Sequence, residues 1–143
     1  MESLKIEDYM DHRAIFFNGS ESVVEAVERL LESNTTGAVV INNDKKVIGF
    51  LSEQDCIKSM LSSSYHSGEL SKNVSDVMKK DVLTKKPYES ILELAVEMSG
   101  TKPKNYPVVD DNEQLVGTIN RTKVLKALDM HFHSIYEHGH HFI

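Results

Sequence analysis

Gly49-Phe50-Leu51 returns 68 residues later as Gly117-Thr118-Ile119, and the same offset relates a long stretch of the chain to itself. Residues 6–60 overlay on residues 74–128 without a gap, and apolar positions agree far more often than identities do. Two copies of one supersecondary unit predict a pseudo-twofold molecule with a cleft between the copies. The identical positions in this overlay are Asp8/Asp76, Met10/Met78, Glu21/Glu89, Ser22/Ser90, Glu25/Glu93, Val40/Val108, Gly49/Gly117 and Lys58/Lys126.

Within each copy the hydrophobic period changes in a fixed order, which predicts strand, helix, strand, strand and helix. Ser22 with Glu25, and Ser90 with Glu93, form capping-box patterns where the first helix of each copy should begin. The expected fold class is therefore a mixed one, α/β in the broad sense and α+β in the narrower sense. The first copy predicts elements at Ala14–Phe17, Val23–Leu31, Ala38–Ile41, Val47–Leu51 and Glu53–Leu61. The second predicts them at Val82–Leu83, Ile91–Met98, Tyr106–Asp110, Leu115–Ile119 and from Arg121 onward.

The chain divides by composition into two repeats, a connection and a tail. We expect repeats at 1–61 and 74–129, a serine-rich linker at 62–73 and a histidine-rich tail at 130–143. A chain of 143 residues that is 40% hydrophobic can bury one sizeable core, and we expect the two repeats to share it.

Charge and composition exclude several classes of function. A net charge of −6 argues against a nucleic-acid partner, because such proteins usually present a basic face to phosphates. Cys56 is the only cysteine, so no intrachain disulfide can form, and we expect it to be buried. No apolar run approaches the roughly 20 residues of a membrane span, and residues 1–5 do not resemble a secretory signal. We expect a cytoplasmic protein without a membrane partner.

Three short motifs resemble the CBS (cystathionine β-synthase) domain family in its tandem form, the Bateman module. Their order within a repeat, their spacing and their duplication carry the resemblance. The motifs are Val74–Met78 before a first strand, Tyr106–Asp110 before a hairpin turn, and the Gly-x-x-Ser-x-x-Asp pattern of Gly49–Asp55. The resemblance covers almost the whole chain. It implies two β-α-β-β-α repeats packed with pseudo-twofold symmetry and a nucleotide site between them.

Ser52 and Asp55 have two interpretations. The structural one is a capping box that begins a helix and contributes about 1 kcal/mol. The functional one uses the same geometry, since free amides and the Ser52 hydroxyl at a helix N-terminus attract anions. The resemblance implies that Asp55 accepts hydrogen bonds from the two ribose hydroxyls of a bound nucleotide.

By the same resemblance, an adenine lies against Phe50, near Thr36 and Ala38, with Phe16 and its strand as another wall. Phe50 offers an aromatic face for stacking, although a core position is an equal alternative. Lys104 is the candidate for the phosphate, and its alternative is an ordinary solvated lysine.

The second copy departs from the motif. Asn120 can still cap a helix, but Lys123 replaces the acidic residue and cannot accept a hydrogen bond from a hydroxyl. Either this second site stays empty, or Lys123 and Arg121 favour an anion. We therefore expect one nucleotide per chain.

The function predicted is a non-catalytic regulatory or sensor module that binds AMP, ADP or ATP and requires no cofactor. The alternative is a nucleotide-free interaction subunit that regulates an enzyme or transporter. No nucleophile elbow, phosphate-binding loop or catalytic metal motif is present in the sequence, so we do not expect an enzyme. The tail histidines do not predict a native metal site, because no cysteine or carboxylate cluster accompanies them.

A homodimer is expected because the predicted helices carry more apolar residues than the sheets can cover. The alternative is a monomer in which residues 132–143 fold back over the exposed face.

Overall fold

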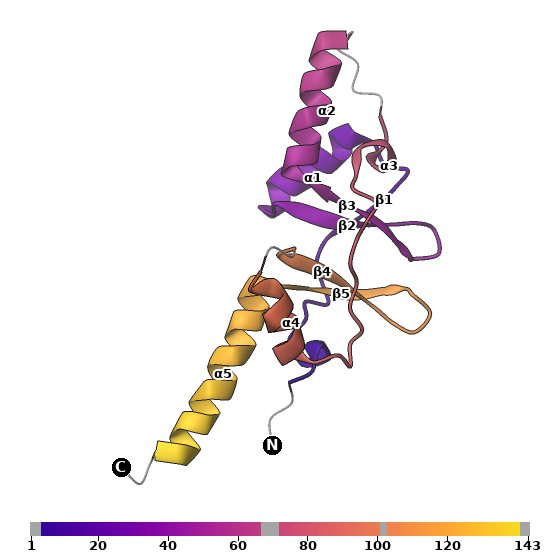
Figure 1. Cartoon of the computed structure of the whole chain (residues 1–143). Helices are drawn as coiled ribbons and strands as arrows, with labels where there is room; N and C mark the ends of the chain where they lie inside the picture. The colour runs from indigo at the N-terminus through magenta and orange to yellow at the C-terminus, as the bar shows by residue number, and fades with distance from the viewer. Residues whose placement is uncertain (1–3, 67–71, 101–102, 141–143) are drawn as a thin grey trace.

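The computed structural model describes residues 4–66, 72–100 and 103–140, and it contains two small sheets that lie next to each other between two outer groups of helices (Figure 1). The first repeat contains β1 (Phe16–Asn18), α1 (Val23–Ser33), β2 (Gly37–Ile41), β3 (Val47–Ser52) and α2 (Glu53–His66). The second contains α3 (Val74–Val77), α4 (Ile91–Met98), β4 (Asn105–Val109), β5 (Leu115–Asn120) and α5 (Arg121–His140). A short 3₁₀ helix, η1 (Ile6–Asp8), precedes both.

The two sheets repeat one pattern of strand pairing. β1 pairs parallel to β2, and β2 pairs antiparallel to β3, in the order β1-β2-β3. The second sheet consists of β4 paired antiparallel to β5. Both antiparallel pairs carry a register shift at equivalent positions, Val40/Ile41 and Val108/Val109, so the duplication extends to the irregularities of the strands.

The serine half of each predicted capping box is present at the start of α1 and of α4. The Ser22 hydroxyl accepts from the Glu25 amide at 3.1 Å, and the Ser90 hydroxyl accepts from the Leu92 and Glu93 amides. α1 ends at Ser33. Asn34 follows it with a left-handed φ of 60°, a conformation that asparagine often adopts after a helix. The predictions of these helices from spacing and caps are confirmed.

The expectation of a single shared core is wrong. Buried apolar side chains of the described residues form two separate clusters, and each is completed by a segment that precedes the other repeat in sequence. Ile6 is fully buried among residues of α4, β4, β5 and α5, while Val74 is fully buried against α1, β2 and β3. Each repeat therefore donates its leading segment to its neighbour.

Backbone pairings make this exchange symmetric. Asp11 and Thr118 exchange two hydrogen bonds of 2.8 and 3.0 Å, and Lys79 and Phe50, the equivalent residues at the offset of 68, exchange bonds of 3.0 and 2.9 Å. Lys46 bridges to its own equivalent, Gln114, so the pseudo-twofold axis passes between them.

Gly49 and Gly117 are identical because the exchanged segments cross directly over them. A Cβ added to Gly49 would lie 2.4 Å from the Met78 sulfur and 2.7 Å from the Lys79 carbonyl oxygen. A Cβ on Gly117 would lie 2.8 Å from the Asp11 carbonyl oxygen and 3.1 Å from the Met10 sulfur. Only a residue without a side chain allows so close an approach.

The predicted strand at Val82–Leu83 is wrong. The second repeat has only an isolated parallel bridge, Lys85 to Val108, where the first repeat has β1. Pro107 accepts from the Lys85 amide at 3.0 Å, so its nitrogen faces the same segment but has no hydrogen to donate. The ladder therefore cannot extend back toward Leu83.

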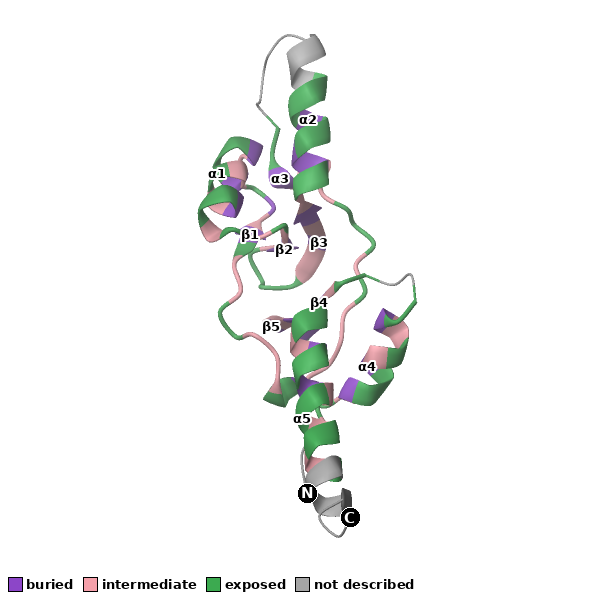
Figure 2. Ribbon diagram, turned by 90° about the vertical axis from the view of Figure 1, so that its left-hand side faces the viewer, coloured by how far each residue is buried: buried purple, intermediate pink, exposed green. Residues whose placement is uncertain are grey.

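Two helices are longer than predicted. α2 continues five residues past Leu61 into the expected linker, and α5 continues through the expected tail to His140. Figure 2 shows that α1 and α4 bury one face against the sheets, whereas α2 and α5 extend away from the sheets and are largely exposed. The boundaries of the repeats, linker and tail stay predictions.

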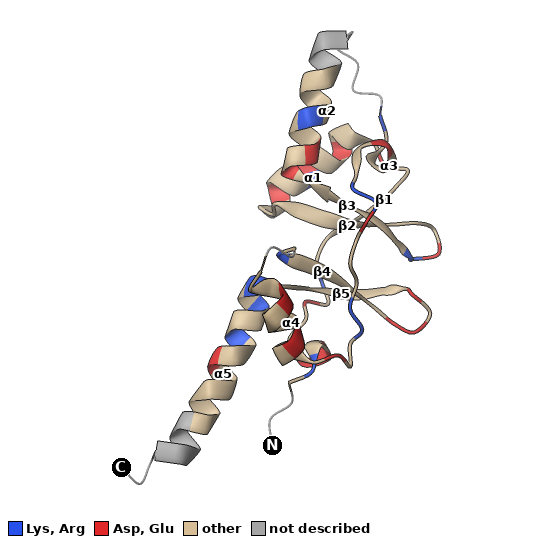
Figure 3. Ribbon diagram, viewed as in Figure 1, with Lys and Arg blue, Asp and Glu red and all other residues tan. Residues whose placement is uncertain are grey.

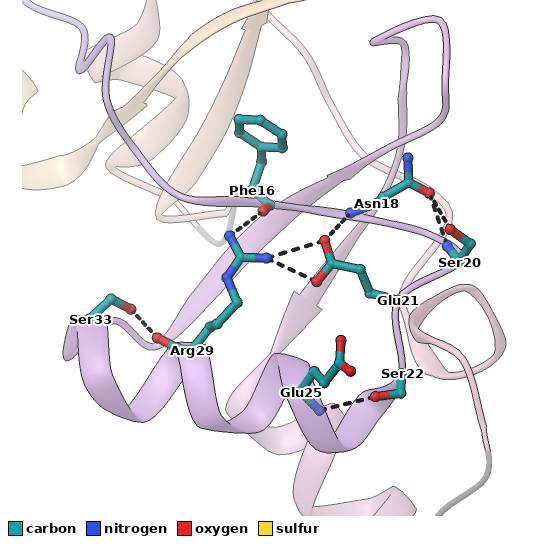
Figure 4. A network of polar contacts seen from close by, with 8 residues as sticks. All are labelled: Phe16, Asn18, Ser20, Glu21, Ser22, Glu25, Arg29 and Ser33. Carbon is teal, nitrogen blue, oxygen red and sulfur yellow. Dashed lines mark hydrogen bonds and ion pairs between the residues drawn. The ribbon is translucent and has the colours of Figure 1, made fainter.

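A polar network ties α1 to β1 (Figure 4). Arg29 pairs with Glu21 at 2.9 Å, donates to the Phe16 carbonyl at 3.0 Å and lies 4.8 Å above the Phe17 ring. The second repeat places its cation on the other element, since Lys85 pairs with Glu97 of α4 at 2.7 Å. Glu97 is equivalent to Arg29, so both repeats use this helical position for an ion pair, with a residue of opposite charge.

Candidate functional site

A cavity of about 530 Å³ lies between the repeats at the N-terminus of α2, and we call it the main cleft. The first repeat contributes the end of β3 and the start of α2. The second contributes the segment before Lys85 and the residues that precede β4. Its lining includes Phe50, Ser52, Gln54, Val82, Leu83 and Lys104.

The first turn of α2 presents polar groups to the main cleft. The Glu53 amide donates to the Thr36 carbonyl at 2.9 Å, and the Asp55 amide donates to the Ser52 hydroxyl at 3.1 Å. The Gln54 amide has no partner among the residues that the structure describes. A free amide at a helix N-terminus favours a bound anion.

Phe50 forms an aromatic wall at the junction of the two repeats. Its ring lies over Gly37, where an added Cβ would be 2.6 Å from the ring. The neighbouring wall is apolar, from Val82 and Leu83. A flat ring beside an apolar wall can accept a planar heterocycle.

Four charged side chains line the main cleft: Lys79 and Lys104 are cationic, and Glu53 and Asp81 are anionic. None of the four makes an ion pair within the described ranges. Figure 3 shows basic residues just before β4 and acidic residues at the start of α2.

Asp55 lies away from the main cleft. Its carboxylate accepts from the Ser52 amide at 3.0 Å, so the capping box expected under the structural interpretation is present. Asp55 is buried and lines a shallow hollow of about 220 Å³ between α2 and the segment 72–77. The predicted contact between Asp55 and a ribose stays a prediction.

A second cavity of about 300 Å³ occupies the equivalent position across the pseudo-twofold axis, and we call it the second cleft. Thr118 and Asn120 line it where the main cleft has Phe50 and Ser52, and Ala14 and Ile15 form its apolar wall. The Asn120 side chain caps α5 by accepting from the Lys123 amide at 2.9 Å.

The structure brings some predicted site residues together and separates others. Phe50, Ser52, Thr36 and Lys104 line the main cleft, and Ala38 lines the second cleft, to which Thr36 and Phe50 also contribute. Phe16 is not among the described residues that line either cleft, and its ring points away from the Arg29 network (Figure 4).

The lining residues missed by sequence reasoning include Glu53, Gln54, Lys79, Asp81, Val82 and Leu83. For the last four the overlay held a signal, because Val82 and Leu83 are equivalent to Ala14 and Ile15, at the start of the Ala14–Phe17 strand that was assigned as a wall. The exchange of leading segments places each such wall opposite the motif of the other repeat.

Cys56 and Tyr106 are buried titratable side chains. Burial raises the pKa of the Cys56 thiol, and the nearby carboxylates of Asp55 and Glu53 raise it further. Burial also raises the pKa of Tyr106, whose hydroxyl has no hydrogen-bond partner in the described part of the chain. Both groups are therefore uncharged at neutral pH.

The described residues contain neither a metal-binding cluster nor a membrane-spanning helix. No cluster of three or more histidine, cysteine or acidic side chains there could hold a metal ion. No helix in the same ranges has the length and apolar character needed to cross a bilayer. Most of the tail histidines lie outside the residues whose side chains are described.

Two sheet-and-helix units related by a pseudo-twofold axis, with segments exchanged and a cavity at the junction, define a CBS-pair module. The chain belongs to the CBS domain family, whose model matches residues 6–62 and 74–130. This confirms the resemblance and the fold class predicted from the sequence.

A curated relative is distant in sequence and much longer than this chain. The chain is 22% identical to a homoserine O-acetyltransferase of Methanosphaera stadtmanae, over 87% of this chain and 24% of that protein. It thus spans about a quarter of that relative.

Two solved structures cover almost the whole chain. The CBS-pair protein CBSX2 from Arabidopsis thaliana, solved in complex with AMP, is 25% identical, with a TM-score of 0.78 over 91% of this chain and 99% of that one. A protein described as AcuB, for acetoin utilization, from Vibrio cholerae is 22% identical, with a TM-score of 0.81 over 96% and 98%, and it supports the fold alone.

Proposed function

We propose that this chain is a non-catalytic regulatory module that binds an adenine nucleotide in the main cleft. The observation that carries the proposal is the composition of that cleft, which joins an aromatic face, an apolar wall, a helix-terminal amide and two lysines; among the described residues the amide has no hydrogen-bond partner and the lysines make no ion pair. CBSX2, which is similar over nearly its full length, was solved with AMP, and this supports the same ligand class.

The chemistry of the cleft assigns a role to each group. The base packs between Phe50 and the Val82–Leu83 wall, where both surfaces are apolar or aromatic. The phosphate lies near the Gln54 amide and Lys104, which provide a hydrogen-bond donor and a positive charge. Asp55 holds Ser52 in place through the cap.

Calorimetric titration with AMP tests this proposal. We expect one AMP per chain, and Lys104→Ala should weaken binding about threefold to tenfold, because an exposed ammonium is partly screened. Lys80→Ala, a nearby exposed lysine that is not among the described lining residues, is the matched control and should leave affinity unchanged. The absence of heat and of any melting shift with millimolar AMP, ADP and ATP would refute nucleotide binding.

We propose further that the module is a homodimer that can dock on a regulated partner. Large apolar side chains are exposed on the outer helices: Leu31, Ile57, Leu61, Val96, Leu125 and Phe132. Self-association through matching faces is the commonest way to bury such surface. Light scattering at micromolar concentration should give about twice the chain mass of 16.2 kDa, and a mass near 16.2 kDa would reject the dimer.

A further inference from the structure

We infer that the main cleft selects an adenine nucleotide with a single phosphate over the triphosphate, and that Glu53 and Asp81 are the residues that set this limit. The inference rests on the proposed function and adds the class of nucleotide that the cleft prefers. It follows from the balance of charge inside one cavity.

The two carboxylates share the main cleft with the two lysines, and none of these four groups is neutralised by an ion pair within the described residues. The cavity thus carries no net charge from its side chains. A phosphate monoester carries about −1.5 to −2 charges at neutral pH, which Lys79 and Lys104 can balance. Further phosphates bring more negative charge, and the charged side chains left to meet it are carboxylates.

Glu53 also weakens the attraction of the helix terminus. It stands in the first turn of α2, where a negative side chain offsets the positive end of the helix dipole that would otherwise favour a polyphosphate. A single phosphate can still use the Gln54 amide, because that bond is local and directional.

The charges of the main cleft are not repeated at the equivalent positions of the overlay. At the offset of 68, Glu53 is equivalent to Arg121, Asp81 to Arg13 and Lys79 to Asp11, so the sign reverses at each position. The overlaid backbone therefore tolerates either sign, and the fold does not require the carboxylates found in the main cleft.

All four charged residues are exposed, so solvent and salt reduce the size of the effect. We expect the wild-type protein to bind AMP about tenfold more tightly than ATP at low ionic strength, with the preference shrinking as salt is added.

The test is calorimetric titration of the full chain with adenosine, AMP and ATP in magnesium-free buffer of low ionic strength. The double variant Glu53→Gln/Asp81→Asn should raise ATP affinity at least fivefold and leave adenosine affinity unchanged. Glu28→Gln/Glu32→Gln on α1 is the matched control, because it makes the same change in net charge at exposed positions that are not among the described lining residues.

Equal affinity of the wild type for AMP and ATP would overturn the inference, as would an unchanged ATP/AMP ratio in the double variant or an equal change in the control. In each of these outcomes the nucleotide still binds, so the proposed function stands. Failure of all three compounds to bind overturns the proposed function itself, and the inference falls with it.

Discussion

Replacing Gly49 with alanine tests whether the exchanged segments hold the two repeats together. The new Cβ would lie 2.4 Å from the Met78 sulfur, 2.8 Å from Met78 Cγ and 2.7 Å from the Lys79 carbonyl oxygen. The sulfur end of methionine can move, but the carbonyl oxygen is fixed because it accepts from the Phe50 amide at 2.9 Å.

The cost has two parts. Moving Lys79 away breaks the two reciprocal hydrogen bonds with Phe50, each worth about 0.5–1.5 kcal/mol. Crowding a packed site adds about 1–3 kcal/mol. Gly49→Ala should therefore lower the free energy of unfolding by about 2–6 kcal/mol. Gly117→Ala should cost somewhat less, because the Met10 sulfur lies farther away at 3.1 Å.

Urea unfolding followed by circular dichroism measures these changes. Gly100→Ala is the matched control, since its Cβ would meet only the Glu97 carbonyl oxygen at 3.8 Å and should cost less than about 0.5 kcal/mol. If Gly49→Ala unfolded within 0.5 kcal/mol of the wild type, the crossing would not be the tight contact described above.

Three further changes test other contacts. Tyr106→Phe should leave stability unchanged or raise it by up to about 1 kcal/mol, because it removes a buried hydroxyl without a partner. Burial raises the pKa of Tyr106 in the folded state, so its contribution to stability is present below about pH 10, the ordinary tyrosine value, and is lost as the pH rises further. Urea titrations from pH 8 to 11 should show a shallower alkaline loss in the variant, and a steeper one would contradict this assignment. Asp55→Ala should cost about 1 kcal/mol by removing the acceptor for the Ser52 amide. AMP affinity measured alongside tests the predicted ribose contact, which requires a loss of at least tenfold. Arg29→Ala should cost about 1 kcal/mol, discounted for the 42% exposure of the arginine side chain, and the loss should shrink in 1 M salt; an equal loss at both salt concentrations would assign the effect to packing.

The order of the elements could be predicted from the sequence because it depends on local patterns. The helical spacing after Ser22 and Ser90, the caps themselves and the hairpin composition each concern residues within a few positions of one another. The start of α5 at Arg121 follows for the same reason. Such signals do not depend on how the repeats pack.

The exchange of leading segments could not be predicted, because it depends on contacts between residues that are far apart in sequence. Gly49 and Gly117 are identical in the overlay, but only the structure shows that residues of the other repeat cross directly over them. The missing strand at Val82–Leu83 depends on Pro107, which lies more than twenty residues away.

The candidate site could be predicted only in part, because it too depends on contacts between residues far apart in sequence. Phe50, Ser52 and Lys104 could be assigned from the motif and its equivalent, and they do line one cleft. The contribution of Val82 and Leu83 to the main cleft could not be assigned, because the overlay relates positions in sequence and does not say which copy faces which. The wall assigned to Phe16 and its strand stays a prediction.

The buried positions of Ile6 and Val74 have a consequence for how such a chain can be divided. Each half lacks a piece of its own interior and supplies the missing piece to its neighbour. The arrangement is that of a domain-swapped dimer whose two partners have been joined into one polypeptide. A single repeat produced alone would have to pair with another copy of itself, each lending its first residues to the other, before either could complete a core.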